Sequence, residues 1–146
     1  MTTTTPTFVP TSHSDTTVVA RPRRRILRTG LAAGTVAALA TTTYAAVLHA
    51  AGVSFVVSGK PIPAPGFGTM TLAAALIGTA LAAALVRTVR DPRRVFLRVT
   101  LVLTALSFVP DVVAHAAYGT RVALVVSHVL AAAIVIPAVA SRCGDA

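Results

Sequence analysis

Four long apolar stretches constrain this chain more than any other feature of its sequence. They cover about residues 27–51, 69–87, 95–118 and 122–140. A helix of about 20 apolar residues rises roughly 30 Å, which is the thickness of the hydrocarbon core of a bilayer. Hydrophobic residues make up 55% of the 146-residue chain and only 12% are charged, a composition that suits lipid better than water. The sequence therefore predicts an all-α, four-span transmembrane helical bundle over residues 21–142.

Basic residues gather at the predicted membrane edges. Of the 13 Lys and Arg residues, five lie within residues 21–28 and five within residues 87–98, and the net charge of the chain is +9. Cytoplasmic loops of membrane proteins carry an excess of Lys and Arg. We therefore expect a multi-pass protein of the bacterial plasma membrane with both termini in the cytoplasm. The chain offers no soluble basic face with exposed aromatic residues, so no nucleic-acid partner is predicted.

The first basic run has two further interpretations. It could contact anionic headgroups of the lipid bilayer, at about 1 kcal/mol per basic residue, through Arg21, Arg23, Arg24, Arg25 and Arg28. Together with Ala38 and Ala40 it also resembles a twin-arginine export signal with its cleavage site. The apolar character continues past Ala40 to Ala51 and three spans follow. We therefore expect the first span to be retained.

Segments outside the spans are irregular. Residues 1–20 are rich in Thr and Pro, which predicts a disordered cytoplasmic tail. Alternate prolines within residues 61–65 force an extended segment, and the apolar piece before it either lengthens the first helix or folds back as a lid over the outer end of the bundle. Gly30 and Gly34 predict close helix packing within the chain, with a homo-oligomer interface as the second interpretation.

The third apolar stretch carries a polar stripe. At roughly 100° per residue, six polar side chains fall within about 80° of one helix face: Thr100, Thr104, Ser107, Asp111, His115 and Tyr118. A carboxyl group within hydrocarbon needs a partner or a wet cavity, so an intramembrane Asp is a functional-site hypothesis. Asp111 and His115 are four residues apart, close enough on a helix for the carboxylate to accept a hydrogen bond from the imidazole.

Three spans bring titratable groups to a similar depth in the outer half of the membrane. His49 lies near the outer end of the first span, and the helix rise places His128 about 9 Å below the outer end of the fourth. The sequence therefore predicts a polar cluster, without a catalytic residue or a bound metal, that consists of His49, Asp111, His115 and His128.

Several roles for this cluster stay open. Its members could hydrogen-bond one another and hold the bundle together. A proton-coupled or solute-conducting protein is the alternative, because His titrates near neutral pH, and four short helices would then act as an oligomer. A second alternative is a metal or haem site, with Asp111 as a ligand or as a group that orients a ligand.

Enzymatic activity is not predicted. The chain has no Glu, no glycine-rich phosphate loop, no nucleophile elbow and no soluble domain that could hold a substrate. We therefore expect a non-enzymatic role in the cell envelope and no cofactor.

The sequence also resembles a family of small actinobacterial four-span integral membrane proteins classed as a domain of unknown function. The resemblance covers about Leu31 to Ala140 and rests on four features: GKPIP at residues 59–63, RDPRRVFL at residues 90–97, TALSFVPD at residues 104–111, and His128. It implies a four-span bundle, and it draws attention to Pro110, Asp111 and His128. It implies no substrate, reaction or catalytic residue.

Overall fold

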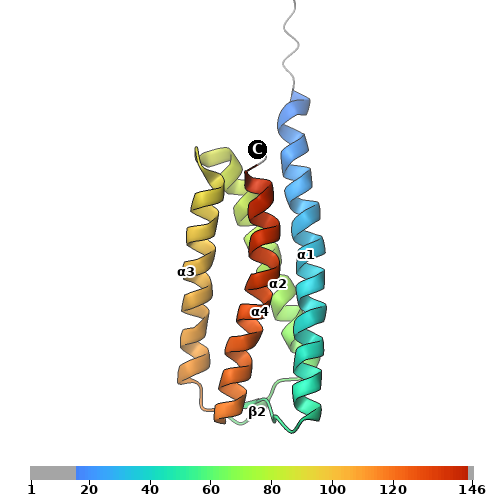
Figure 1. Ribbon diagram of the computed structural model, residues 1–146, viewed down its shortest axis with the longest axis vertical. Helices are drawn as coiled ribbons and strands as arrows, with labels where there is room; N and C mark the ends of the chain where they lie inside the picture. Colours follow the sequence, from blue (N-terminus) through green and yellow to red (C-terminus); the bar gives the residue numbers. More distant parts are fainter. Residues whose placement is uncertain (1–15, 145–146) are drawn as a thin grey trace, which may run out of the picture.

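The computed structural model describes residues 16–144, and their side chains from residue 23 onward. Within this range the chain forms α1 (Thr16–Ala50), α2 (Ala64–Thr88), α3 (Pro92–Val113) and α4 (Tyr118–Cys143), with a short hairpin of β1 (Val56–Val57) and β2 (Lys60–Pro61) between the first two helices. The helices run up and down side by side (Figure 1). The predicted all-α, four-span bundle is confirmed.

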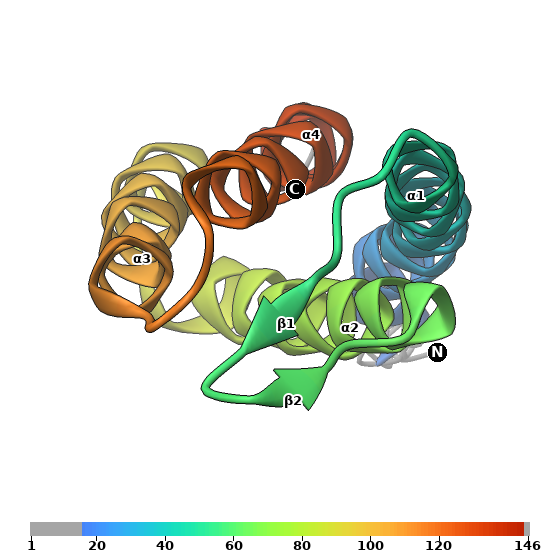
Figure 2. The same cartoon turned by 90° about the horizontal axis from the view of Figure 1, so that it is seen from below.

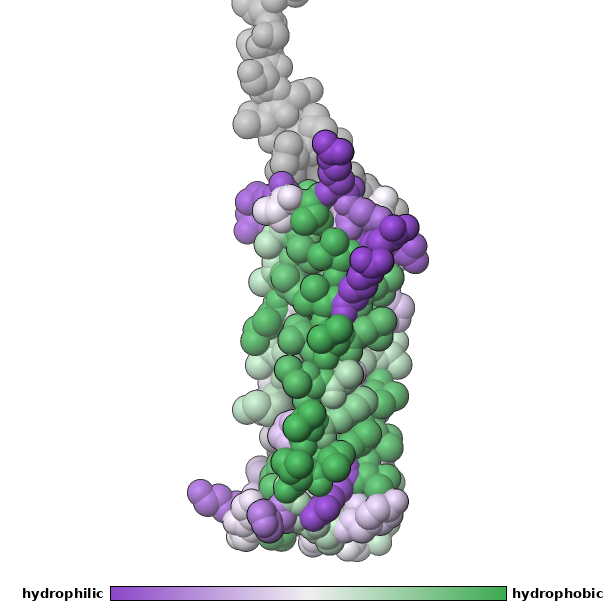
Figure 3. All heavy atoms as spheres, turned by 90° about the vertical axis from the view of Figure 1, so that its left-hand side faces the viewer, coloured by the Kyte–Doolittle hydropathy of each residue, from purple (hydrophilic) through white to green (hydrophobic). Residues whose placement is uncertain are grey.

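Each of these helices is long and apolar enough to cross a membrane, over Arg23–Ala50, Ala64–Thr88, Pro92–Val113 and Tyr118–Cys143. Figure 3 shows a broad apolar band on one face of the bundle, with polar residues gathered at its two ends. Many large apolar side chains are exposed in the middle of the helices, including Ile77 and Leu103. Such a surface is stable in lipid and costly in water, so the architecture is that of a multi-pass membrane protein.

The predicted N-terminal tail, residues 1–20, lies only partly within the residues that the structure describes. Residues 1–15 of the predicted tail lie outside the described residues, whereas α1 begins at Thr16, within that tail. Extending an existing helix fixes one residue for each hydrogen bond gained, so a helix anchored by a long apolar span can continue toward the N-terminus at little cost.

The third span is shorter than expected. The prediction of residues 95–118 as one helix is wrong at its outer end, because α3 stops at Val113 and Tyr118 already belongs to α4. The 22 residues of α3 rise roughly 33 Å, which is enough to cross the hydrocarbon core, so the chain can reverse there. Residues 114–117 make that reversal. At its inner end α3 begins at Pro92, three residues before the predicted start, and Oδ1 of Asp91 accepts a hydrogen bond from the Arg94 amide at 3.1 Å.

Close packing between α1 and α2 uses glycine. A Cβ atom added at Gly30 would overlap the side chain of Thr79, and one added at Gly34 would lie 2.9 Å from Cβ of Ala75. Small residues at four-residue spacing let helix backbones approach closely in lipid, where packing replaces the hydrophobic drive. The predicted packing of Gly30 and Gly34 within the chain is confirmed, and the α2 face that meets them contains Ala75 and Thr79.

The loop between α1 and α2 folds back over the outer end of the bundle, here defined as the end with the hairpin (Figure 2). Ser58 and Gly59 form its turn with φ angles of 49° and 77°, and Val56 pairs with Pro61. Positive φ angles at both central residues are typical of a type I′ turn, whose backbone twist matches the twist of the two strands that it joins. The Ser58 amide donates to the carbonyl of His115 at 2.9 Å, which ties the hairpin to the α3–α4 turn. Of the two predicted courses for this loop, the structure adopts the lid.

Two apolar clusters hold the ends of the bundle. At the outer end Phe55 is buried and packs edge-on against Phe67, with ring centroids 4.9 Å apart. At the inner end Phe96 packs with Ile26 and Val139. Between the clusters α3 packs mainly on α4, and α2 lies mainly against α1. The α2–α3 contact is therefore the loosest side of the bundle.

Candidate functional site

The outer half of the bundle contains one contact between titratable side chains of α3 and α4. Oδ2 of Asp111 lies 2.9 Å from Nδ1 of His128. Asp111 is buried, with 8% of its surface exposed. The same Nδ1 lies 3.1 Å from the carbonyl of Leu124, and the ring N–H is aligned with that carbonyl. Oδ2 of Asp111 therefore meets no aligned donor.

This arrangement makes the Asp111 carboxyl group depend on the side chain that faces it. A buried carboxylate oxygen without a donor is costly, and the cost is greatest in lipid. The imidazole ring of His128 is the titratable side chain that the structure places against this oxygen, at 2.9 Å. The contact can therefore fix α3 against α4.

Local sequence explains why these two side chains meet. Pro110 lies within α3 and cannot donate its backbone nitrogen, so the turn just before Asp111 lacks one helical hydrogen bond. Phe108 packs edge-on against the His128 ring, with centroids 6.4 Å apart. The segment from Phe108 to Asp111 thus contacts the His128 imidazole through an aromatic ring and a carboxyl group.

The other two predicted members of the cluster lie elsewhere. His115 is exposed in the α3–α4 turn, because α3 has ended two residues before it, and no hydrogen bond joins its side chain to Asp111. His49 is exposed at the end of α1, where its Nδ1 lies 3.2 Å from the carbonyl of Val53. The structure therefore brings together Asp111 and His128 and leaves His49 and His115 outside their contact.

A metal ion needs several protein ligands at one place, whereas a haem needs one or two. Within residues 23–144 no group of three or more His, Cys, Asp or Glu side chains is arranged to hold a metal ion. Cys143 is buried at the inner end of α4, and His49 and His115 lie apart from the Asp111–His128 pair. The described side chains thus provide a contact of two potential ligands at this position.

A cavity of about 320 Å³ lies beside His128, and we call it the intramembrane groove. It is lined by α2 between Thr71 and Leu81, by α3 between Phe96 and Ser107, and by α4 between His128 and Ile136. Ile77 of α2 and Leu103 of α3 line it and are more than half exposed, so the groove faces the lipid between these helices. Its volume is within the usual range for small-molecule sites.

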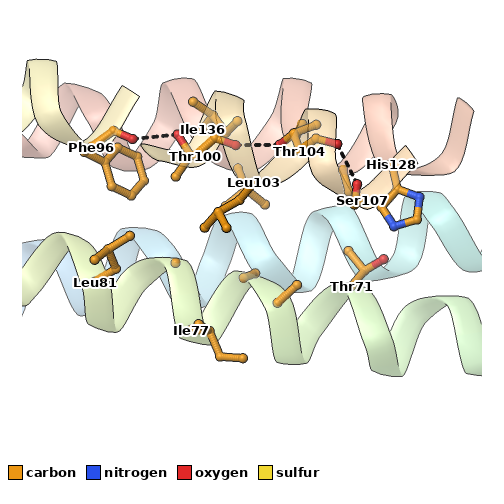
Figure 4. A pocket seen from close by; sticks show the side chains of 16 residues that line it. Thr71, Ile77, Leu81, Phe96, Thr100, Leu103, Thr104, Ser107, His128 and Ile136 are labelled. Atoms are coloured by element: carbon orange, nitrogen blue, oxygen red, sulfur yellow. Dashed lines mark hydrogen bonds between the residues drawn. The ribbon is translucent and has the colours of Figure 1, made fainter. Parts of the chain in front are cut away.

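The groove is apolar along most of its length and has its polar groups on the α3 and α4 side. Figure 4 shows Phe96 at one end, Ser107 and His128 at the other, and Thr100 and Thr104 between them. The sequence prediction found these hydroxyl groups as a stripe on α3. It missed the groove, and the available signal was Gly78 in α2, whose missing side chain leaves open space on the groove wall.

The inner end of the bundle carries most of the basic residues. Arg23, Arg24, Arg25 and Arg28 are exposed on α1, and the arginine-rich α2–α3 turn lies at the same end (Figure 1). The side chain of Arg21 lies outside those that the structure describes. The end with the hairpin carries Lys60 and Arg121 instead.

Comparisons with known proteins place the chain in a family without assigning it an activity. No curated protein and no solved structure matches the sequence. A family model does match, and it covers residues 21–145, from the basic run before the first span through the last helix. The chain therefore belongs to DUF6069, a family of unknown function.

Proposed function

We propose that this protein is a non-enzymatic membrane protein of the bacterial cell envelope that binds a membrane amphiphile, with the apolar chain of the ligand in the intramembrane groove. The observation that carries this proposal is the groove itself. It lies within the hydrocarbon-spanning part of α2, α3 and α4, has a volume of about 320 Å³, and opens between the exposed side chains of Ile77 and Leu103.

A lipid-derived ligand fits the chemistry of the groove better than a solute. A binding site takes its ligand from the surrounding solvent, which at this depth consists of acyl chains. Most of the groove wall is aliphatic, with Ala74, Leu81 and Ile136 among the lining residues. An apolar chain can fill such a site without leaving a polar group unpaired, whereas a charged solute could not.

Support for a non-enzymatic role comes from the state of the hydroxyl groups. The Ser107 hydroxyl donates its proton to the carbonyl of Thr104 at 2.7 Å and not to a base. A serine nucleophile needs a neighbouring base to take its proton. Binding without chemistry is therefore the simplest use of this site.

A fluorescence experiment tests the groove as a lipid site. The chain contains no Trp, so a single Ile77→Trp substitution at the rim gives a reporter without background. In vesicles with a small fraction of phospholipid carrying dibrominated chains, we expect emission from the Ile77→Trp reporter to be quenched at a lower mole fraction than emission from Leu31→Trp. Leu31 is an exposed position of α1 at matching depth, because its neighbour Gly30 packs on Thr79.

A filled groove provides the control. Gly78 lines the groove and a Cβ atom there meets nothing within 4 Å, so Gly78→Leu should be tolerated and should occupy the cavity. We expect it to bring quenching of the Ile77→Trp reporter to the level of Leu31→Trp, whereas Ala80→Leu on the exposed side of α2 should leave it unchanged. Equal quenching of both reporters in the otherwise unchanged protein would contradict the proposal.

A proton-coupled role is the second candidate, and the Asp111–His128 contact favours it. Two titratable groups 2.9 Å apart can exchange a proton, and burial keeps Asp111 away from water. The protein would then act as an oligomer. Asp111→Asn provides the test: a folded variant whose proton flux in vesicles equals that of the unchanged protein would remove this candidate.

We also propose an orientation and a lipid partner. The basic end would lie in the cytoplasm, following the positive-inside rule, with both termini on that side of the plasma membrane. The exposed side chains of Arg23, Arg24, Arg25 and Arg28 would contact anionic headgroups there, together with Arg21.

A further inference from the structure

The polar groups of the intramembrane groove have used their hydrogen-bond donors within the protein. Thr100 donates to the carbonyl of Phe96 at 2.8 Å, and Thr104 donates to the carbonyl of Thr100 at 2.8 Å. Ser107 donates to the carbonyl of Thr104 at 2.7 Å (Figure 4). Each of these hydroxyl groups has only one proton to donate, and its oxygen keeps lone pairs that can accept. The α3 wall therefore offers acceptors.

Thr71, the polar residue of the α2 wall, also donates its hydroxyl proton within the protein. Its hydroxyl oxygen lies 3.1 Å from that of Thr41 on α1. Thr41 already donates to the carbonyl of Ala37 at 3.0 Å. The proton in the contact between the two threonines must then come from Thr71, which leaves Thr71 as an acceptor as well.

His128 completes the set at the outer end of the groove. Its Nδ1 faces two oxygen atoms, the carbonyl of Leu124 at 3.1 Å and Oδ2 of Asp111 at 2.9 Å. A carbonyl oxygen can only accept, so the proton of the neutral imidazole lies on Nδ1. The other ring nitrogen, Nε2, then carries a lone pair and has no hydrogen-bond partner among the described residues.

We infer that the ligand of the groove is a hydroxyl-bearing amphiphile, whose O–H group donates to Nε2 of His128 while its apolar chain extends along α3 toward Phe96. Asp111 is a positioning residue, because it helps to keep the proton of the ring on Nδ1 and does not itself line the groove. This inference rests on the proposed function and adds the class of the headgroup. A carboxylate or ether headgroup would meet acceptors only, and would gain no hydrogen bond there.

Displacement of the brominated lipid tests the headgroup. In the Ile77→Trp protein at neutral pH, 1-hexadecanol should restore emission at a concentration about three- to tenfold lower than its methyl ether, which has the same chain without a donor. Methyl hexadecanoate, an ester without a donor, should displace the lipid no better than the ether. His128→Phe should remove the preference for the alcohol and leave displacement by the ether unchanged.

Because His128→Phe leaves Asp111 buried without a partner, the double variant Asp111→Leu/His128→Phe is measured as well. It removes the acceptor at Nε2 without leaving a lone buried carboxyl group. We expect a folded protein that binds the alcohol and the ether equally. Asp111→Leu alone should weaken the preference for the alcohol, because only the Leu124 carbonyl then orients the ring.

The possible failures are distinguishable. If neither the alcohol nor the ether restores emission from the Ile77→Trp reporter, the groove is not a lipid-chain site and the proposed function fails. If both restore it equally in the protein with intact His128, the groove binds chains but the headgroup inference is overturned. A preference for methyl hexadecanoate over the alcohol would also overturn it, because it would require a donor at the end of the groove.

Discussion

Oδ2 of Asp111 lies 2.9 Å from Nδ1 of His128, yet the ring N–H of His128 is aligned with the Leu124 carbonyl and not with the carboxyl oxygen. The histidine therefore keeps an acceptor for its ring N–H when Asp111 is removed, whereas the carboxyl oxygen loses the polar side chain that faces it when His128 is removed. Asp111 therefore depends on His128 more than His128 depends on Asp111. Loss of His128 should harm the protein more than loss of Asp111.

A double-mutant cycle tests this asymmetry. His128→Phe replaces the polar ring that faces the buried carboxyl group by an apolar one and should lower the free energy of unfolding by about 1 to 3 kcal/mol. Asp111→Leu should cost less, because the imidazole keeps the Leu124 carbonyl. The double variant should recover most of the loss, with a coupling energy of about 1 kcal/mol. Reversible unfolding in detergent micelles provides the measurement.

The control for this cycle uses the histidine that sequence spacing pairs with Asp111. His115 is exposed in the α3–α4 turn, so Asp111→Leu and His115→Phe should have additive effects. A coupling energy for Asp111 with His115 that equals the one with His128 would contradict the arrangement of side chains described above.

Close approach of α1 and α2 gives a second prediction. Gly30→Ala should destabilise the bundle by about 1 to 3 kcal/mol, because the new methyl group would overlap the side chain of Thr79. Combining it with Thr79→Ala should restore part of the stability. Gly78→Ala is the matched control, since its Cβ atom meets nothing within 4 Å. Equal unfolding midpoints for Gly30→Ala and Gly78→Ala would show that the two helices do not pack through Gly30.

The fold was largely predictable from the lengths of the apolar stretches. A span needs about 20 apolar residues whatever its neighbours are, so the number and type of the helices follow from composition along the chain. The ends of the helices do not follow in the same way. Residues 114–117 contain neither Gly nor Pro and still form the turn, because tertiary packing and the tie between His115 and Ser58 decide where the chain reverses.

Of the candidate site, only the depth of its residues in the membrane could be predicted from the sequence. Asp111 and His128 belong to different helices, and counting residues from the membrane edge places them at similar heights. Pairing Asp111 with His115 required α3 to continue past Val113, which it does not. The groove exists because α2 packs loosely against α3. The spacing of residues along either helix does not indicate how tightly the two helices pack.

The hairpin provides a third prediction, since its turn needs positive φ angles. Gly59 has a φ of 77°, which costs an L-residue about 1 kcal/mol, so Gly59→Ala should loosen the hairpin. Ser58→Asn should tighten it, because Asn-Gly is the preferred pair in such turns. Hydrogen exchange of the backbone amide at position 58, which donates to the carbonyl of His115, should become faster in the first variant and slower in the second, relative to the intrinsic rate of the residue present. Unchanged exchange in Gly59→Ala would contradict the role of the turn.

The orientation of the bundle gives the last prediction. Cys143 is the single cysteine, so Cys143→Ser provides a background in which one new cysteine can be labelled. Lys60 lies in the hairpin and is exposed, and Arg90 lies in the turn at the opposite end. If the basic end faces the cytoplasm, a membrane-impermeant maleimide added to intact cells should label Lys60→Cys and leave Arg90→Cys unlabelled until the membrane is opened. The reverse pattern would invert the proposed orientation and would place the outer end of the groove on the cytoplasmic side.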